Sequence, residues 1–349
     1  MANIQGPLII NLDSTYILDE EVSLLKNQLI GGVILFEHNY HDINQIRLLI
    51  QNIKNINDKL KIFIDHEGGR VQRFRTGLTH LPSFEIIGNV YNSDKNIGKE
   101  LSYCAGYVAG YELKTLGIDI NFSPVVDLRI SSDVMKGRTF ADNGNDVVDL
   151  VKPYLNGLIE NGIIPTLKHF PGHGCVSGDT HLELSKSNLT ISELNNHLYP
   201  FIKIHKEFNV PIMTSHIQFD SISDHPVTTS STWLDNITTD IFNINPFYIS
   251  DDLEMKGISK RYPDLSRIKL LEKSLSCGCS MAIVTTMQDQ MIINKQKSSQ
   301  FYMDEYITMI DSMNYNSDIT LQCLTDLSYN KGSMSSYKKA KDFIKGYIN

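Results

Sequence analysis

One glycine-rich segment of the chain carries an unusual density of titratable side chains. KHFPGHGCVSGDTH, residues 168–181, holds one lysine, three histidines and one aspartate, with three glycines and one proline between them. Imidazole and carboxylate groups in such a cluster could exchange a proton with a substrate or hold a metal ion. Proline and glycine disfavour a helix, so the segment is predicted to be a loop that follows a strand.

Other charged residues stand at the ends of short apolar runs. A charge inside a strand that is buried on both faces would be costly, so these residues should lie where the strands end. The ends of several parallel strands meet at one mouth, and this mouth is where we expect a site. The residues in question are Asp65, Asp127, Lys168, His169, His216, Asp251 and Asp252.

The runs themselves predict the fold. Eight are nearly continuous in apolar and β-branched residues, as in parallel strands buried on both faces; they cover residues 7–12, 31–36, 61–65, 118–127, 163–170, 210–217, 246–252 and 280–286. Amphipathic stretches such as 42–58, 96–116 and 191–208 lie between them. The alternation predicts an α/β chain with a (β/α)8 TIM barrel, whose active site would lie at the carboxyl ends of the strands. An open doubly wound sheet is the alternative.

No linker rich in glycine, serine or proline interrupts the pattern, so residues 1–349 are interpreted as a single domain. The barrel would cover about residues 7–286, and residues 287–349 would form a polar, mostly helical tail. The last stretch of this tail, SYKKAKDFIKGYIN, resembles a basic surface helix and has no assigned role.

Composition excludes several classes of protein. The formal net charge of −8, from 40 acidic and 32 basic residues, argues against a nucleic-acid partner. No apolar stretch approaches the roughly 18 residues of a membrane span, and the N-terminus lacks a signal-peptide pattern, so we expect a cytoplasmic protein. The cysteines are few, scattered and odd in number, which fits a reducing compartment; they are Cys104, Cys175, Cys277, Cys279 and Cys323.

Four segments together resemble glycoside hydrolase family 3, and within it the compact NagZ-type β-N-acetylglucosaminidases. In chain order they are DHEGGRVQRFR, KGRTF, KHFPGHGCVSGDTH and ISDDLEMKGI, and the resemblance runs from about residue 7 to 286. The third segment, with its Asp-Thr-His ending, is the most specific. His66 departs from the pattern, because the family usually has glutamine there.

The resemblance implies a retaining mechanism, in which a nucleophile and a proton donor flank the anomeric carbon roughly 5 Å apart. Side chains alternate along a strand, so Asp251 and Asp252 should point in opposite directions. The sequence alone does not choose between them, and the family pattern favours Asp251 as the nucleophile. Larger family members take their acid from a second domain. This chain has no such domain in its pattern, so the resemblance implies His181 as acid/base and Asp179 as its partner.

The remaining site residues are also implied by the resemblance. Asp65, Arg73, Arg138, Lys168 and His169 would contact the hydroxyl groups of the sugar. Arg70 and Asp127 are interpreted as structural, and His173 as a brace for the loop. No cofactor and no metal are expected. The implied partner is a small carbohydrate, such as an N-acetylglucosaminyl-1,6-anhydro-muramyl peptide of cell-wall recycling, bound by a monomer that contacts neither nucleic acid nor membrane.

Three alternatives stay open at this point. A metal-dependent hydrolase could use His169, His173, Asp179 and His181, although the proline and glycines argue against the helix that an HxxxH ligand pair needs. A glycoside phosphorylase could use the same catalytic residues, because a neutral histidine tolerates an approaching phosphate. A sugar-binding protein without turnover could do without Asp251 or His181, and both are present.

Overall fold

Each of the eight apolar runs contains at least one strand of a single parallel sheet. The computed structural model describes residues 2–4, 6–129, 135–176, 184–285, 319–321 and 332–348. Seven of the eight runs are longer than the strands they correspond to, β3 is as long as its run and begins one residue earlier, and the run 163–170 contains two strands. The strands of the sheet are β2 (Leu8–Asn11), β3 (Ile30–Leu35), β4 (Lys61–Ile64), β7 (Ile120–Asn121), β8 (Ile164–Pro165), β9 (Leu167–Phe170), β11 (Ile212–Thr214), β13 (Tyr248–Ser250) and β14 (Met281–Ile283).

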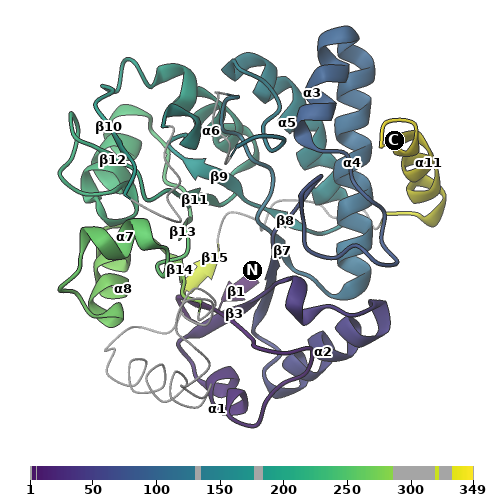
Figure 1. Cartoon of the computed structure of the whole chain (residues 1–349), viewed down its shortest axis with the longest axis horizontal. Helices are drawn as coiled ribbons and strands as arrows, with labels where there is room; N and C mark the ends of the chain where they lie inside the picture. Colours follow the sequence, from purple (N-terminus) through teal and green to yellow (C-terminus); the bar gives the residue numbers. More distant parts are fainter. Residues whose placement is uncertain are drawn as a thin grey trace.

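The sheet closes on itself through β8 and β9. Its order is β8-β7-β4-β3-β2-β14-β13-β11-β9, so the two outer positions are held by neighbouring segments of one run. The backbone N–H of Thr166 donates to the Ser123 carbonyl at 3.1 Å, and the N–H of Val126 donates to the Lys168 carbonyl at 2.9 Å. These bonds join the fourth run to the fifth. The predicted (β/α)8 barrel is therefore confirmed, and the open sheet is excluded (Figure 1).

Helices surround the barrel (Figure 1). Asp42 caps α2 and Asp94 caps α4 by accepting backbone N–H bonds, as the N-cap rule expects. The helices outside the C-terminal segment are α1 (Glu21–Lys26), α2 (Ile43–Ile56), α3 (Phe84–Ser93), α4 (Lys95–Leu116), α5 (Gly144–Glu160), α6 (Asn195–Phe208), the π-helix η4 (Thr232–Ile241), α7 (Lys256–Arg261) and α8 (Arg267–Ser276).

Two of the three predicted helices match closely, and the third begins late. The stretches 42–58 and 96–116 correspond to α2 and α4, whereas 191–208 becomes helical only at Asn195. Residues before it form a turn in which the Glu193 carboxylate accepts hydrogen bonds from the N–H and the hydroxyl of Thr190, both at 2.8 Å. A side chain that caps this turn postpones the helix.

Short elements follow several strands at their carboxyl-terminal ends. The antiparallel hairpin of β5 (His66–Gly68) and β6 (Val71–Gln72) follows β4 directly. The 3-10 turn η2 (His173–Cys175) follows β9, and β10 (Lys186–Ser187) pairs in parallel with β12 (Gln218–Phe219). Further 3-10 turns are η1 (Glu37–Asn39) and η3 (Val227–Thr229). Of these segments, the β5–β6 hairpin contributes Glu67 and Val71 to a cavity at the mouth of the barrel.

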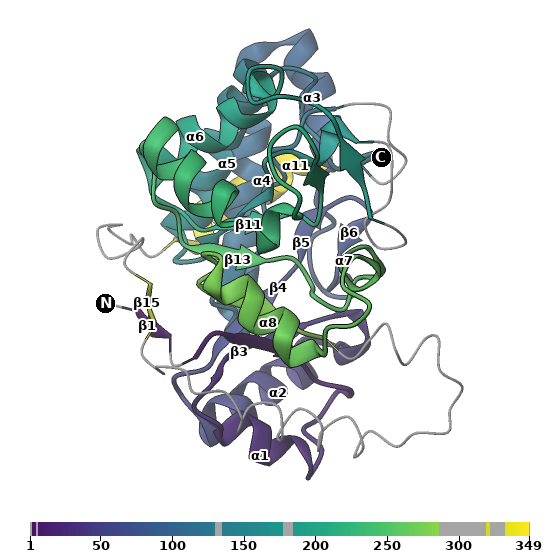
Figure 2. The ribbon, with the colours of Figure 1, turned by 90° about the vertical axis from the view of Figure 1, so that its left-hand side faces the viewer.

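Two described segments belong to the predicted tail. Strand β15 (Ile319–Leu321) pairs antiparallel with β1 (Ala2–Ile4), apart from the barrel sheet (Figure 2). Helix α11 (Met334–Lys345) packs on α4 (Figure 1). The rest of the predicted helical tail lies outside the described residues, and the single-domain interpretation stays a prediction. Within the described ranges, no helix has the length and apolar character needed to cross a membrane.

Candidate active site

One cavity at the mouth collects most of the predicted site residues. Its volume is about 370 Å³, within the range of small-molecule sites. Asp251 lines it together with all five residues predicted to contact the sugar, namely Asp65, Arg73, Arg138, Lys168 and His169. Residues spread over nearly two hundred positions of sequence therefore meet because the strands that precede or contain them end at the same mouth.

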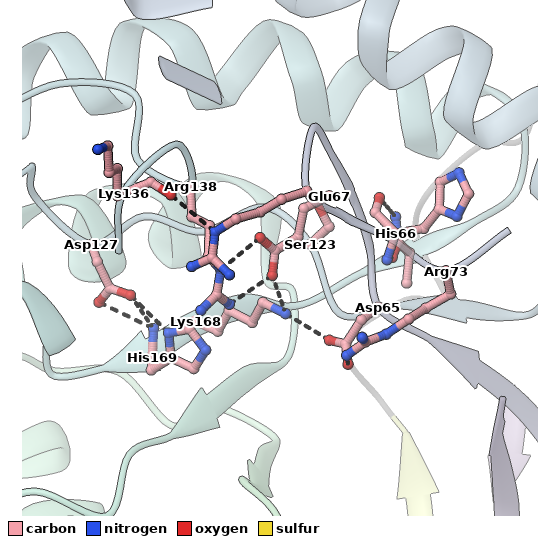
Figure 3. A network of polar contacts seen from close by, with 12 residues as sticks. Asp65, His66, Glu67, Arg73, Ser123, Asp127, Lys136, Arg138, Lys168 and His169 are labelled. Carbon is pink, nitrogen blue, oxygen red and sulfur yellow. Dashed lines mark hydrogen bonds and ion pairs between the residues drawn. The ribbon is translucent and has the colours of Figure 1, made fainter. Parts of the chain in front are cut away.

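Side chains of alternating charge that line this cavity form a network of polar contacts (Figure 3). The Lys168 ammonium group lies between two carboxylates, 2.7 Å from Asp65 Oδ1 and 2.8 Å from Glu67 Oε1. Arg138 binds Glu67 in a bidentate manner, with Nε–Oε2 at 2.9 Å and Nη2–Oε1 at 2.8 Å. Arg73 donates to Asp65 Oδ2 at 3.1 Å. Three cations are thus held in fixed positions by two carboxylates.

The ion pairs keep both carboxylates charged. Burial alone would raise the pKa of Asp65, but the charges of Lys168 and Arg73 outweigh it and hold the pKa well below its ordinary value. Burial likewise opposes ionisation of Glu67, and Arg138 and Lys168 nevertheless lower its pKa to about 2. Glu67 therefore carries no proton to donate near neutrality, which argues against it as the general acid.

A buried aspartate orients His169. The Asp127 carboxylate, 1% exposed, lies 2.7 Å from Nδ1 of His169 and accepts from the backbone N–H of the same residue. It also accepts from the N–H of His173 at 2.7 Å, and its pKa stays below its ordinary value despite burial because of the two histidines. The carboxylate favours a proton on Nδ1 of His169, so Nε2 remains for other contacts. The structural interpretation of Asp127 agrees with this position.

Asp251 and Asp252 have different surroundings. The carboxylate of Asp252 accepts from the N–H groups of Glu254 and Thr285 and from the Thr285 hydroxyl, and burial raises its pKa to about 6. Its oxygens are thus bound by Glu254, which follows β13, and by Thr285, which follows β14. Asp251 Oδ1 accepts from the N–H of Asp252 at 2.9 Å, and Asp251 lines the cavity. Both aspartates border the cavity, and the carboxylate of Asp252 accepts three hydrogen bonds from Glu254 and Thr285.

His216 braces the loop after β13. Its Nε2 lies 2.9 Å from the carbonyl oxygen of Asp252, and its Nδ1 lies 2.9 Å from the hydroxyl of Thr228. The side chain is fully buried. Because the ring spans from η3 to the chain beside Asp251, it fixes the backbone on which the predicted nucleophile stands.

Apolar side chains also line the cavity. They include Phe36, Phe122, Met213 and Met255, and the guanidinium of Arg73 lies 5.4 Å from the ring centroid of Phe36. A cavity lined by both charged and apolar side chains suits a sugar ring, which presents hydroxyl groups at its edge and C–H groups on its faces.

The predicted acid/base pair, Asp179 and His181, lies outside the described residues. The segment before it is tied to the barrel through His173, whose pKa burial lowers to about 4. Gly172 has a φ of 136°, and a Cβ at Gly174 would lie 2.4 Å from the Leu128 carbonyl oxygen. Glycine is therefore needed at position 172 for an unusual backbone conformation and at position 174 for close packing.

The catalytic and sugar-contact residues predicted above do not include Glu67 or Thr285, and both line the cavity. The signal for Glu67 was present, because residues two apart in an extended segment share a side, and Asp65 precedes Glu67 by two. Arg70 is exposed, donates Nε–H to the carbonyl of Lys136 at 3.1 Å, and borders the cavity. His66 is fully buried, and its ring nitrogens have no hydrogen-bond partner among the described residues.

The structure describes only part of the ligand set that a metal-dependent hydrolase would need. His169 and His173 both contact Asp127, and the other two residues of the set fall in the stretch 177–183 that is not described. Across the described ranges, no group of three histidine, cysteine, aspartate or glutamate side chains could hold a metal ion.

Comparisons with known proteins agree with one another. Residues 9–309 match the family described as glycosyl hydrolase family 3 N terminal domain. A protein of Thioalkalivibrio sulfidiphilus named beta-hexosaminidase is 35% identical over 289 residues, which cover 82% of both chains. Native NagZ from Neisseria gonorrhoeae superimposes with a TM-score of 0.79 at 29% identity, covering 99% of this chain and 98% of that one. The same protein in complex with N-trifluoroacetyl-D-glucosamine gives the same TM-score.

Proposed function

Because this chain belongs to glycoside hydrolase family 3 and is a glycoside hydrolase of the β-hexosaminidase type, we propose that it is a retaining exo-β-N-acetylglucosaminidase. It would remove terminal β-linked N-acetylglucosamine from its substrates. One observation carries the proposal: Asp251 and the five predicted sugar contacts line the same cavity at the carboxyl ends of the barrel strands.

The first step forms a covalent intermediate. A carboxylate oxygen of Asp251 attacks the anomeric carbon, and the bond from that carbon to the aglycone oxygen breaks. His181, as imidazolium, gives its proton to the departing oxygen. Before this transfer, Asp179 stabilises the positive charge of the His181 imidazolium. The products of this half-reaction are the free aglycone and a glycosyl ester on Asp251.

The second step regenerates the enzyme. His181, now neutral, takes a proton from a water molecule, whose oxygen attacks the anomeric carbon and displaces Asp251. Two inversions at this carbon give net retention. The histidine returns to its protonated form, and N-acetylglucosamine leaves.

The surroundings of the two aspartates support this assignment of the nucleophile. The Asp252 oxygens accept three hydrogen bonds from Glu254 and Thr285, which hold that carboxylate in place and lower its nucleophilicity. The low pKa of Glu67 also supports an acid from elsewhere, and His181 is the candidate that the sequence provides.

The preference for an N-acetylated sugar rests on relatives. The Neisseria gonorrhoeae protein has been solved with N-trifluoroacetyl-D-glucosamine, an N-acylated glucosamine. We extend this preference to the present chain and propose 1,6-anhydro-muramyl peptides of peptidoglycan recycling as the source of the glycosidic bond. A monomer located in the cytoplasm would fit this role.

Hydrolysis of a chromogenic β-N-acetylglucosaminide beside the matching β-glucoside tests the proposal. We expect release of the chromophore from the first compound, with N-acetylglucosamine of β configuration as the initial product. Cleavage of the β-glucoside alone would contradict the acetamido preference. Repeating the assay with phosphate distinguishes the phosphorylase, which would yield a sugar phosphate, and repeating it with a chelator distinguishes a metal-dependent enzyme, which would lose activity.

A further inference from the structure

The loop that carries Arg73 is closed on itself by one glutamine. Gln72, at the end of β6, donates its Nε2 hydrogens to the carbonyls of Phe74 at 3.1 Å and Thr79 at 2.8 Å, and its Oε1 accepts from the N–H of Leu81 at 2.9 Å. The glutamine is 2% exposed, so these bonds compete little with water. Residues 73–81 therefore form one closed loop, whose position sets that of Arg73.

A buried glutamate on α4 anchors the outer end of this loop. Both carboxylate oxygens of Glu112 lie 3.0 Å from the N–H of Thr79, and the Thr79 hydroxyl donates to Oε1 at 2.5 Å. Glu112 is 4% exposed. A carboxylate at such a depth depends on its hydrogen-bond donors, because loss of a donor leaves a buried charge poorly compensated. The carbonyl of Thr79 also accepts a hydrogen bond from Gln72 Nε2, so Thr79 links the glutamine to the glutamate.

The C-terminal helix supplies a further donor to the same carboxylate. The Tyr337 hydroxyl donates to Oε1 of Glu112 at 2.7 Å, and the Tyr337 ring stacks on Tyr111 with centroids 4.5 Å apart. Ile344 of α11 is fully buried, and the N–H of Ser333 donates to the Tyr107 hydroxyl at 2.9 Å. Helix α11 is thus fixed to α4 at the point where α4 holds the loop (Figure 1).

We propose that helix α11 supports the sugar-binding loop, with Tyr337 acting through Glu112 and Thr79 as a positioning residue for Arg73. This inference rests on the proposed function, in which Arg73 contacts the sugar. Arg73 lies 3.1 Å from Asp65 Oδ2, so a shift of the loop would change both the ion pair and the contact with the substrate. The proposal gives a role to helix α11, for which the sequence suggested none.

Two tyrosine-to-phenylalanine variants form a matched pair. Tyr337→Phe removes the bond to Glu112 and keeps the aromatic stack. Tyr103→Phe removes an equivalent 2.7 Å bond from a tyrosine of α4 to Glu160, away from the loop. We expect KM for the N-acetylglucosaminide to rise by about three- to tenfold in Tyr337→Phe, with kcat within about twofold, whereas Tyr103→Phe keeps the KM of the wild type. Equal KM values in both variants would overturn the inference.

A second measurement does not depend on activity. Amide hydrogen exchange over residues 73–82 should be faster in Tyr337→Phe than in the wild type and unchanged in Tyr103→Phe, because local opening follows the loss of local contacts. Unchanged exchange in Tyr337→Phe would refute the support role even in an active enzyme. A wild-type protein that cleaves no β-N-acetylglucosaminide would refute the proposed function instead, and the exchange result would still decide this inference.

A double-mutant cycle tests the route through Arg73. If Tyr337 acts on substrate binding only by positioning Arg73, Tyr337→Phe should have no further effect on kcat/KM in an Arg73→Ala background. Additive losses would show that α11 affects the site by another route and would overturn the assigned role of Arg73 in the chain of contacts.

Discussion

Replacement of Glu67 by glutamine should destabilise the protein strongly and should not remove its general acid. Glu67 is 2% exposed and contacts Lys168 at 2.8 Å and Arg138 at 2.8 and 2.9 Å. Its pKa falls from 4.5 to about 2, which corresponds, at about 1.4 kcal/mol per pH unit, to about 3 kcal/mol of stabilisation at pH 7. The same order of cost is typical when one partner of a buried ion pair is removed.

The contribution of Glu67 to the free energy of unfolding should decrease as the pH falls. The pKa of Glu67 is lower in the folded than in the unfolded state, so its contribution is fully present above about pH 4.5 and is lost as the pH falls toward 2. The difference in the free energy of unfolding between the wild type and Glu67→Gln should therefore be about 3 kcal/mol at pH 7 and should shrink between pH 4.5 and pH 3.

Urea denaturation followed by fluorescence measures this difference. The chain has one tryptophan, the fully buried Trp233, which provides the signal. Glu272→Gln is the control, because Glu272 pairs with Lys269 at 2.7 Å on the surface and should contribute under about 1 kcal/mol. A loss below about 1 kcal/mol for Glu67→Gln at pH 7 would refute the buried-network reasoning. A selective loss on substrates with poor leaving groups would show instead that Glu67 is the acid.

Four further variants test the predicted roles of site residues. Lys168→Ala should lower kcat/KM on every substrate, and a good leaving group should not restore it, which a series of aryl glycosides would check. Asp127→Asn should raise KM more than it lowers kcat, because the ring of His169 loses the anion that fixes its tautomer; an unchanged KM would contradict this. His181→Ala should damage disaccharide cleavage far more than cleavage of a dinitrophenyl glycoside, and azide should accelerate the variant. Asp179→Asn should give a milder form of the same pattern, and equal slowing of all substrates without an azide effect would make the histidine a binding residue.

Strand positions could be predicted because a parallel strand buried on both faces leaves a simple pattern in the sequence. The runs at 61–65 and 246–252 each end in aspartates, and burial of the strand interior requires those charges to lie at its end. The sequence therefore predicted that Asp65, Lys168 and Asp251 would meet at one mouth, and the cavity contains all three.

The ion pairs between side chains at the mouth of the barrel could not be predicted from the apolar runs. Lys168 and Asp65 are 103 residues apart, and their contact depends on the register in which the strands close into the barrel. The position of Glu67 between Lys168 and Arg138 depends on the β5–β6 hairpin, which no apolar run marks. Likewise, the docking of α11 depends on single polar contacts, such as that of Tyr337 with Glu112, which sequence periodicity does not reveal.

Trapping of the glycosyl–enzyme intermediate tests the central claim most directly. A 2-fluoro sugar with a good leaving group should inactivate the protein, because fluorine slows both steps and the good leaving group restores only the first, so that the glycosyl–enzyme accumulates. Peptide mass spectrometry should then find the sugar on Asp251, and Asp251→Ala should neither turn over substrate nor become labelled. A label on Asp252, or a labelled and active Asp251→Ala variant, would contradict the account.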